Sequence, residues 1–448
     1  MAKLVEKYIE IAAQKNPGEP EFLQTVEEVL TSIEPVLEAH PEYVKAGLIE
    51  RLIEPERGIS FRVPWVDDNG VVQVNRGYRY EFNSAIGPYK GGLRFAPNVC
   101  PSIIKFLGFE QIFKNSLTGL PIGGGKGGAD FDPNGKSDGE IMRFCQSFMN
   151  ELFRHIGAQT DVPAGDLGVG AREIGYLYGQ YKRLVNRFEG VLTGKGIPYG
   201  GLKGRTEATG YGIVFFARHM LEACGEKLEG KNVAISGFGN VSWGTATKLN
   251  QLGAKVITIS GPDGYVYDED GVTLGEKVDF MLQLRASGKN IVAPYAEKFP
   301  SAKFFPGKKP WEVKADLYIP CATQNEIRMA DAEQMVANGC KFLCEGSNMP
   351  TKNEAVAYLQ ANGVIVGPSK AANAGGVACS CIEMGQNAGH TVFSPDQVYA
   401  QLETIMVNIH KNAAEASQRY GLGYDLVKGA NIAGFEKVAQ AMMAQGIV

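Results

Sequence analysis

The chain has 448 residues, of which 44% are hydrophobic and 21% charged, and its formal net charge is −4. This length is enough for two to three domains, and the slightly acidic balance argues against nucleic acid as a partner. The eight cysteines form no C-x-x-C pair and the five histidines have no metal-ligand spacing, so we expect reduced structural thiols and no metal site.

The sequence shows no targeting segment. The N-terminus lacks the apolar core of a signal peptide and the Arg-rich, acid-poor composition of a transit peptide. No run of about 18 apolar residues occurs, which predicts that no segment spans a membrane. We therefore expect a cytoplasmic protein.

The first 200 residues mix helical and strand patterns. The stretch "FLQTVEEVLTSIEPVLEAH", residues 22–40, predicts one amphipathic helix. The stretch "GISFRVPWVDDNGVVQVNRGYRYEFNS", residues 58–84, predicts two strands joined at Asp68-Asn69-Gly70. Helical patterns return at residues 102–120 and 138–156, so this half is mixed α and β.

The stretch "LPIGGGKGGADFDP", residues 120–133, places Lys126 between two glycine clusters. It is not a nucleotide-phosphate loop, because that pattern needs Ser or Thr after the lysine and residue 127 is glycine. The alternative is a lysine used for chemistry. Other cations close by, for which Lys90 and Lys114 are candidates, would lower its pKa and let it exchange protons near neutral pH. Asp166 in "DVPAGDLGVG" is a candidate for a second proton carrier.

A glycine-rich stretch near residue 200 predicts a hinge, and the pattern after it is strand, glycine turn, helix, strand. Residues 237–242, "GFGNVS", have the form G-x-G-x-x-S between the expected strand 233–236 and a helix that runs to residue 252. This context predicts a dinucleotide site, in which glycines admit the pyrophosphate to the helix N-terminus. Asp263 follows the next strand, 255–260, where an acid would bind the ribose hydroxyls of NAD. We expect NAD, with NADP as the alternative. The apolar runs "ADLYIPCA", "CKFLCEG" and "GVIVGPS" predict further parallel strands.

Several motifs together resemble one family over essentially the whole chain. They are "IGPYKGGLRFAP", "LPIGGGKGGADFDP", "DVPAGDLGVGAREIGY", "EATGYG", "ISGFGNV", "PCATQNEI" and "PSKAANAGGV". In this order they closely resemble the Glu/Leu/Phe/Val dehydrogenase family, and within it the smaller hexameric bacterial glutamate dehydrogenases.

The resemblance implies a role for each matched residue. Lys126 would be the catalytic lysine that activates water and stabilises the carbonyl or carbinolamine oxygen, and Asp166 would shuttle protons. Lys114 with Gln111 would hold the substrate α-carboxylate. The residues implied at the distal carboxylate are Lys90 and Ser380, and the further substrate-side residues are Gly165, Arg205 and Val377. The residues implied on the cofactor side are Gly237, Gly239, Asn240 and Val241 at the pyrophosphate, Thr209, Asn348 and Asn373 at the nicotinamide ribose and amide, and Ala322 and Thr323 on the second strand-end loop. The glycines around Lys126 would let substrate and nicotinamide approach the backbone.

The implied fold is α/β with two domains. Residues 1–200 would form a substrate-binding and oligomerisation domain, to which 424–448 returns, and residues 201–423 a Rossmann-like, doubly wound dinucleotide domain. The implied reaction is reversible NAD(P)-dependent oxidative deamination of L-glutamate to 2-oxoglutarate and ammonia, in a cleft between the domains of a homohexamer.

Two other functions stay open. A related dehydrogenase of leucine, valine or phenylalanine would have an apolar group where Lys90 and Ser380 stand, since a buried lysine without a carboxylate partner is costly. A cofactor-binding protein without catalysis would be expected to lack Lys126 or Asp166, and both are present.

Overall fold

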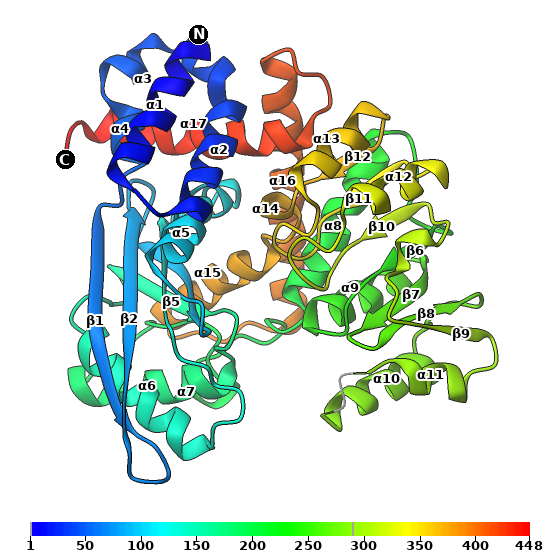
Figure 1. Cartoon of the computed structure of the whole chain (residues 1–448), viewed down its shortest axis with the longest axis horizontal. Coiled ribbons are helices and arrows are strands. Elements are labelled where there is room, and N and C mark those ends of the chain that lie inside the picture. Colours follow the sequence, from blue (N-terminus) through cyan, green and yellow to red (C-terminus); the bar gives the residue numbers. More distant parts are fainter. Residues whose placement is uncertain (1, 289–290) are drawn as a thin grey trace. The chain divides into compact units, whose positions relative to one another are not determined.

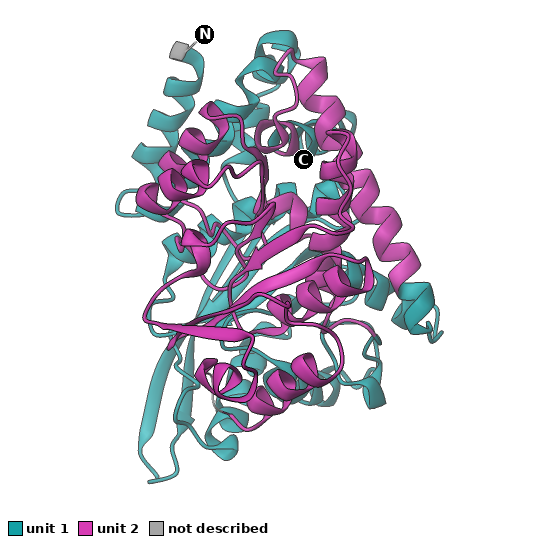
Figure 2. Ribbon diagram, turned by 90° about the vertical axis from the view of Figure 1, so that its right-hand side faces the viewer, with its two compact units in different colours: residues 1–203, 377–398, 431–448 teal, residues 204–376, 399–430 magenta. Residues whose placement is uncertain are grey.

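The structure is a computed structural model that describes residues 2–288 and 291–448. It divides into two compact units (Figure 2), which are described separately. Unit 1 comprises residues 1–203, 377–398 and 431–448, and unit 2 comprises residues 204–376 and 399–430. These bounds differ from the expected ones, because 377–398 belongs to unit 1 and 424–430 to unit 2. The first difference has a clear cause: Glu383 accepts a hydrogen bond from Nζ of Lys195 at 2.8 Å, and both side chains are buried.

Unit 1 is a mixed sheet with helices on both faces. Its elements are α1 (Ala2–Lys15), α2 (Pro20–Ala39), α3 (Pro41–Lys45), α4 (Leu48–Leu52), β1 (Arg57–Val66), β2 (Val72–Asn83), β3 (Tyr89–Phe95), α5 (Pro101–Leu117), β4 (Gly124–Ala129), α6 (Asp138–Leu152), β5 (Asp161–Gly165), α7 (Ala171–Val185) and the 3₁₀ turn η1 (Ile197–Tyr199). The helices α15 (Gly375–Ala388), α16 (Pro395–Arg419) and α17 (Leu426–Gln445) also enter this unit. The long β1–β2 hairpin stands out in Figure 1.

The unit 1 sheet has the order β1-β2-β4-β3-β5. β1 and β2 pair antiparallel in the predicted hairpin, whereas β4 and β5 run parallel to β3. One face packs on α6 and α7 through an aromatic core that includes Phe95, Phe131 and Phe144. The other face approaches α5, where Gly108 lies against the Cβ of Lys126.

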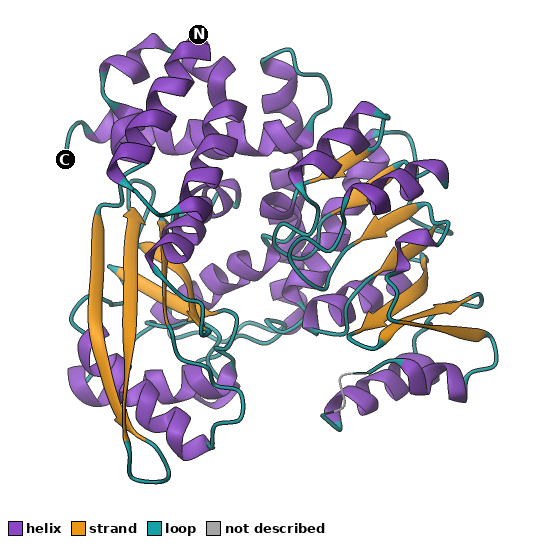
Figure 3. Ribbon diagram, viewed as in Figure 1, coloured by secondary structure: helices purple, strands orange, loops and turns teal. Residues whose placement is uncertain are grey.

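Unit 2 is a Rossmann-like layer structure in which helices lie on both faces of the strands (Figure 3). Its elements are α8 (Ala208–Ala223), β6 (Asn232–Ile235), α9 (Asn240–Gln251), β7 (Lys255–Gly261), β8 (Gly264–Asp268), α10 (Glu276–Ala286), α11 (Ala293–Lys298), β9 (Ala302–Pro306), η2 (Pro310–Glu312), β10 (Leu317–Ile319), α12 (Met329–Ala337), β11 (Phe342–Cys344), α13 (Asn353–Ala361), β12 (Ile365–Gly367) and α14 (Ser369–Ala372).

The unit 2 sheet has the order β12-β11-β10-β6-β7-β8-β9. The predicted parallel strands are confirmed, because β12, β11, β10, β6 and β7 all pair in parallel. The antiparallel strands β8 and β9 were not predicted. The order reverses at β6, with β10 on one side and β7 on the other, which is where such sheets bind ligands.

Candidate active site

Lys126 lies in β4, the central strand of the unit 1 sheet, although glycine clusters are more typical of turns. All six residues of β4 are buried. A Cβ on Gly124 would lie 2.7 Å from Cγ1 of Ile112, and one on Gly128 only 2.2 Å from the carbonyl oxygen of Arg94. The expectation that these glycines leave room for a ligand is therefore wrong at these two positions. They let α5 and β3 pack directly on the strand.

The structure brings together Lys126 and Asp166, the two residues to which the resemblance gave catalytic roles. Nζ of Lys126 lies 3.2 Å from Oδ2 of Asp166, and the two side chains are 8% and 18% exposed. Asp166 directly follows β5, which pairs with β3 beside β4. Gly92 on β3 leaves the necessary gap, since a Cβ there would lie 2.8 Å from Cβ of Asp166 and 3.2 Å from Nζ of Lys126.

Arg94 completes this cluster and was not predicted. Its Nε donates a hydrogen bond of 2.9 Å to the same Oδ2 of Asp166. Behind the cluster, Arg79 on β2 forms an ion pair with Asp161, with both side chains fully buried, and donates to the carbonyl oxygen of Gly91. Lys126 and Arg94 thus share the carboxylate of Asp166, and Arg79 pairs separately with Asp161.

The charges of the cluster set its protonation states. Burial lowers the pKa of Lys126, the charge of Asp166 opposes this, and Arg94 and Arg79 lower the pKa further. Burial would raise the pKa of Asp166, but the charges of Lys126 and Arg94 outweigh it and bring this pKa to about 2. The carboxylate is therefore ionised at neutral pH, and the lysine gives up its proton more readily than a lysine in water.

Lys90 is fully buried on β3, and its Nζ donates a 2.8 Å hydrogen bond to Oγ1 of Thr193. Its charge also acts on the thiol of Cys381, whose pKa burial raises, so the segment of α15 around Ser380 lies near Lys90. Thr193 was not predicted, because it is 103 positions away in the chain.

The remaining substrate-side residues of unit 1 lie around the same strands. Gln111 and Lys114 are on α5, and Gln111 donates to Oδ1 of Asn115 at 2.6 Å. Asn115 in turn donates to the carbonyl oxygens of Lys90 and Gly123, which ties α5 to β3 and to the start of the β4 segment. Gly165 ends β5, and Val377 is on α15.

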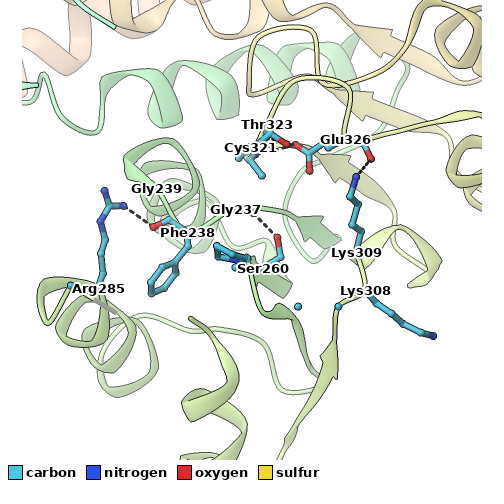
Figure 4. Close-up of a pocket in the computed structure, with 16 residues that line it drawn as sticks. Gly237, Phe238, Gly239, Ser260, Arg285, Lys308, Lys309, Cys321, Thr323 and Glu326 are labelled. Carbon is cyan, nitrogen blue, oxygen red and sulfur yellow. Dashed lines mark hydrogen bonds between the residues drawn. The ribbon is translucent and has the colours of Figure 1, made fainter. Parts of the chain in front are cut away.

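Unit 2 contains a cavity of about 750 Å³ at the carboxyl ends of its strands (Figure 4). The predicted Gly237 and Gly239 line it, as do Ala322 and Thr323. Gly237 has φ +87°, and a Cβ there would lie 2.5 Å from Oγ of Ser242. No side chain caps the start of α9, and the first N–H groups of a helix have no partner within it. The glycine backbone and this helix start fit a dinucleotide pyrophosphate.

Asp263 does not line this cavity, although its neighbours Pro262 and Gly264 do. Its carboxylate accepts 3.0 Å hydrogen bonds from the N–H groups of Val292 and Ala293. This geometry does not support the ribose-binding role predicted for Asp263. The carboxylate is already used to hold the start of α11.

Glu326 is a buried residue of the cavity that the sequence did not single out. Its Oε1 accepts hydrogen bonds from the N–H groups of Ala322 and Thr323, so it holds the second strand-end loop. Burial raises the pKa of Glu326 to about 7. Figure 4 shows it beside Lys309, whose Nζ donates to the carbonyl oxygen of Glu326 at 2.7 Å.

The other predicted cofactor residues fall into separate groups within unit 2. Asn373 donates to Oδ1 of Asn348 at 3.0 Å. Thr209 on α8 and Arg205 both lie near the position of a Cβ on Gly376. Asn240 and Val241 begin α9.

Among residues 2–288 and 291–448, no group of three or more His, Cys, Asp or Glu side chains could hold a metal ion. No helix within those ranges is both long and apolar enough to cross a membrane.

Comparison with known families decides the membership of the chain. The family model described as Glutamate/Leucine/Phenylalanine/Valine dehydrogenase matches residues 200–446, and the Glu/Leu/Phe/Val dehydrogenase dimerisation domain matches residues 55–183. The chain belongs to the Glu/Leu/Phe/Val dehydrogenase family. The resemblance inferred from its motifs is thereby confirmed, as is the two-domain α/β fold.

Individual members of the family are similar to the chain over its full length. The NAD-specific glutamate dehydrogenase of Clostridium symbiosum is 59% identical over 449 residues, covering 100% of both chains. The NADP-specific glutamate dehydrogenase of Haemophilus influenzae is 53% identical, covering 99% of this chain and 98% of its own. A solved structure of a glutamate dehydrogenase has a TM-score of 0.98 at 58% identity and covers 100% of both chains.

Proposed function

We propose that this chain catalyses the reversible oxidative deamination of L-glutamate to 2-oxoglutarate and ammonia, with NAD as the preferred cofactor. The observation that carries the proposal is the buried pair of Lys126 and Asp166, whose Nζ and Oδ2 atoms are 3.2 Å apart. Such a pair provides a proton acceptor and a proton donor at one point. Relatives named NAD-specific glutamate dehydrogenase, 57–59% identical over the full length, support the assignment.

The cations of unit 1 favour a substrate with two carboxylates. Lys90 is fully buried beside Thr193, and Lys114 lies on α5, between Gln111 and Asn115 in sequence. L-Glutamate and 2-oxoglutarate carry a carboxylate at each end, and two separated cations match them. A leucine or phenylalanine side chain would place an apolar group against the ammonium of Lys90, where the distal carboxylate of glutamate would form a charge-assisted hydrogen bond.

The two acid–base groups have distinct tasks in the proposed reaction. Asp166 accepts a proton from the substrate ammonium group and so frees the amine. When bound, NAD would supply the acceptor for the hydride of the substrate Cα. Neutral Lys126 then takes a proton from the water that attacks the imine carbon, and its charged form stabilises the oxygen of the carbinolamine. Asp166 returns its proton to the departing nitrogen and then accepts the hydroxyl proton of the carbinolamine as the carbonyl forms. Asp166 and Lys126 each release one proton afterwards, which leaves 2-oxoglutarate, ammonium and one free proton.

The cavity in unit 2 would hold the cofactor. Gly237, Gly239 and the start of α9 would bind the pyrophosphate, and the loop at Ala322 and Thr323 would lie along the dinucleotide. NAD is favoured over NADP because the relatives named NAD-specific are 57–59% identical, whereas NADP-specific relatives are 53% identical.

The test is an amination assay on the purified chain. We expect 2-oxoglutarate and ammonium to oxidise NADH rapidly and NADPH more slowly. The oxo acid of leucine, which lacks the distal carboxylate, should react at least about a hundredfold more slowly, because it cannot form the ion pair that this carboxylate would make with Lys90. Activity with NADPH alone would reverse the cofactor preference. Faster turnover of the branched oxo acid would overturn the substrate assignment.

A further inference from the structure

We propose that Arg94 is a positioning residue for the reaction: it fixes the carboxylate of Asp166 against the amino group of Lys126 and, as a permanent cation, biases that lysine toward its neutral form. The inference rests on the roles proposed above for Lys126 and Asp166. It assigns to Arg94 a task that neither of those two residues can perform.

The geometry of Arg94 carries the proposal. Lys90, Gly92 and Arg94 alternate along β3 and therefore face the same side of the sheet. Nε of Arg94 lies 2.9 Å from Oδ2 of Asp166, and Nζ of Lys126 lies 3.2 Å from the same oxygen. The side chain of Arg94 is 16% exposed, comparable with the 18% of Asp166. Both contacts are made to Oδ2, and we assign the proton exchange with the substrate to the other oxygen, Oδ1.

Asp166 needs an external restraint because of its place in the chain. It follows the last residue of β5, and its carbonyl oxygen accepts a 2.9 Å hydrogen bond from the N–H of Val169 in a tight turn that contains Gly168 at φ +73°. A side chain on a turn has more freedom than one in a strand. Arg94 is on β3, which pairs with both β4 and β5, so its backbone is held firmly and its guanidinium can restrain the carboxylate.

Arg94 differs from Lys126 in that its guanidinium group stays charged. While Lys126 is neutral, before it takes a proton from water, it does not attract the carboxylate of Asp166 as a cation. An arginine stays charged throughout. Arg94 therefore holds Asp166 in place at the stage of the reaction where the lysine cannot.

The charged groups that act on Lys126 come from three neighbouring segments. They are Asp166 after β5, Arg94 on β3 and Arg79 on β2. Burial lowers the pKa of Lys126, Asp166 raises it, and Arg94 and Arg79 lower it. Arg94 also lowers the pKa of Asp166. Removing Arg94 therefore raises the pKa of Lys126 and the pKa of Asp166. Both effects shift the pH dependence of the reaction to higher pH.

The experiment compares Arg94→Gln with the unmodified enzyme in L-glutamate deamination. The acid limb of the kcat/KM profile reports groups that must lose a proton, and we expect it to move up by about one pH unit. We expect kcat above this limb to fall about ten- to a hundredfold, because the carboxylate is no longer held. The pH dependence of Lys126 acetylation by acetic anhydride, followed by peptide mass spectrometry, should shift upward as well, and this readout does not need turnover.

Two further variants complete the test. Arg154→Gln is the matched control, because Arg154 is an exposed arginine of the same unit that pairs with Glu151 at 3.1 Å, and it should change neither profile. Arg94→Lys keeps the charge without the guanidinium fork, so its acid limb should stay within about 0.3 pH units of the original while kcat falls about tenfold. If Arg94→Gln does not fold, Arg94→Lys decides, and an unchanged kcat overturns the proposal.

The outcomes separate this inference from the proposed function. Folded Arg94→Gln enzyme with unshifted activity and acetylation profiles would overturn the role of Arg94 alone. Wild-type turnover in Lys126→Ala or Asp166→Asn would instead remove the proposed catalytic roles, whatever Arg94 does.

Discussion

The carboxylate of Asp263 accepts hydrogen bonds from two backbone N–H groups, those of Val292 and Ala293, at the start of α11. The sequence alone indicated a ribose-binding acid at this position, because Asp263 follows β7 at about the expected spacing. Spacing fixes where the residue stands along the chain. It does not fix which way the side chain turns, and a nearby helix start competes for the carboxylate.

We predict that Asp263→Ala acts on stability. Two N–H groups lose their acceptor, which should lower the free energy of unfolding by about 1–3 kcal/mol and reduce Tm measured by calorimetry. Asp270→Ala is the control, because Asp270 is exposed in the same unit, and Tm should stay within about 1 °C. An unchanged Tm together with a much higher KM for NADH would show that Asp263 binds the ribose after all.

Sequence analysis did not identify Arg94 and Thr193, and the physical reason is the same for both. Arg94 contacts Asp166 across 72 positions of sequence, and Thr193 contacts Lys90 across 103. Neither arginine nor threonine stands out by type or spacing, since each acquires its role only when strands distant in sequence pair. Lys126 and Asp166 could be named in advance because their surrounding motifs match a family.

At the scale of elements, β4 is a strand that its amino-acid composition does not predict. The sequence "GGKGGA" has few strand-forming residues, and glycine clusters usually indicate turns. The strand forms because β2 pairs with it on one side and β3 on the other, which satisfies its backbone groups. Its glycines are needed where neighbouring backbone comes close, as at Gly128.

We predict that Gly128→Ala is strongly destabilising. The added Cβ would lie 2.2 Å from the carbonyl oxygen of Arg94, so β3 must shift, at a cost of about 3 kcal/mol or more. Gly179→Ala in α7 is the matched control. Apart from its chain neighbours and the backbone of its own helix, no described heavy atom lies within 4 Å of a Cβ there, and alanine should stabilise the helix by about 0.5–1 kcal/mol. Chemical denaturation measures both, and a Gly128→Ala variant as stable as the original would contradict the packing described for β4.

The parallel part of the unit 2 sheet was predictable, whereas its antiparallel edge was not. Strands β6, β7, β10, β11 and β12 are short apolar runs, as buried parallel strands should be. Strand β8 follows a glycine turn, and strand β9 follows the helices α10 and α11. The residues of these two strands neither form a short apolar run nor alternate regularly between buried and exposed. Their pairing depends on β7, which periodicity in one segment cannot reveal.

At the scale of the whole molecule, the proposed tasks divide between the two units. Unit 1 contains the proposed catalytic pair and almost all substrate-side residues, and unit 2 contains the cofactor cavity. Arg205 is the exception, since it belongs to unit 2. The homohexamer stays a prediction, because the structure contains one chain.

This division gives the most direct test of the account, which is Lys126→Ala measured in two ways. We predict that turnover of L-glutamate falls at least about 10³-fold, because the variant loses the acid–base group. Binding of NADH, followed by its fluorescence, should stay within about twofold of the original, because the cavity of unit 2 contains no part of β4. Near-normal turnover in a folded Lys126→Ala enzyme would contradict the account, since the buried lysine would then have no part in the chemistry.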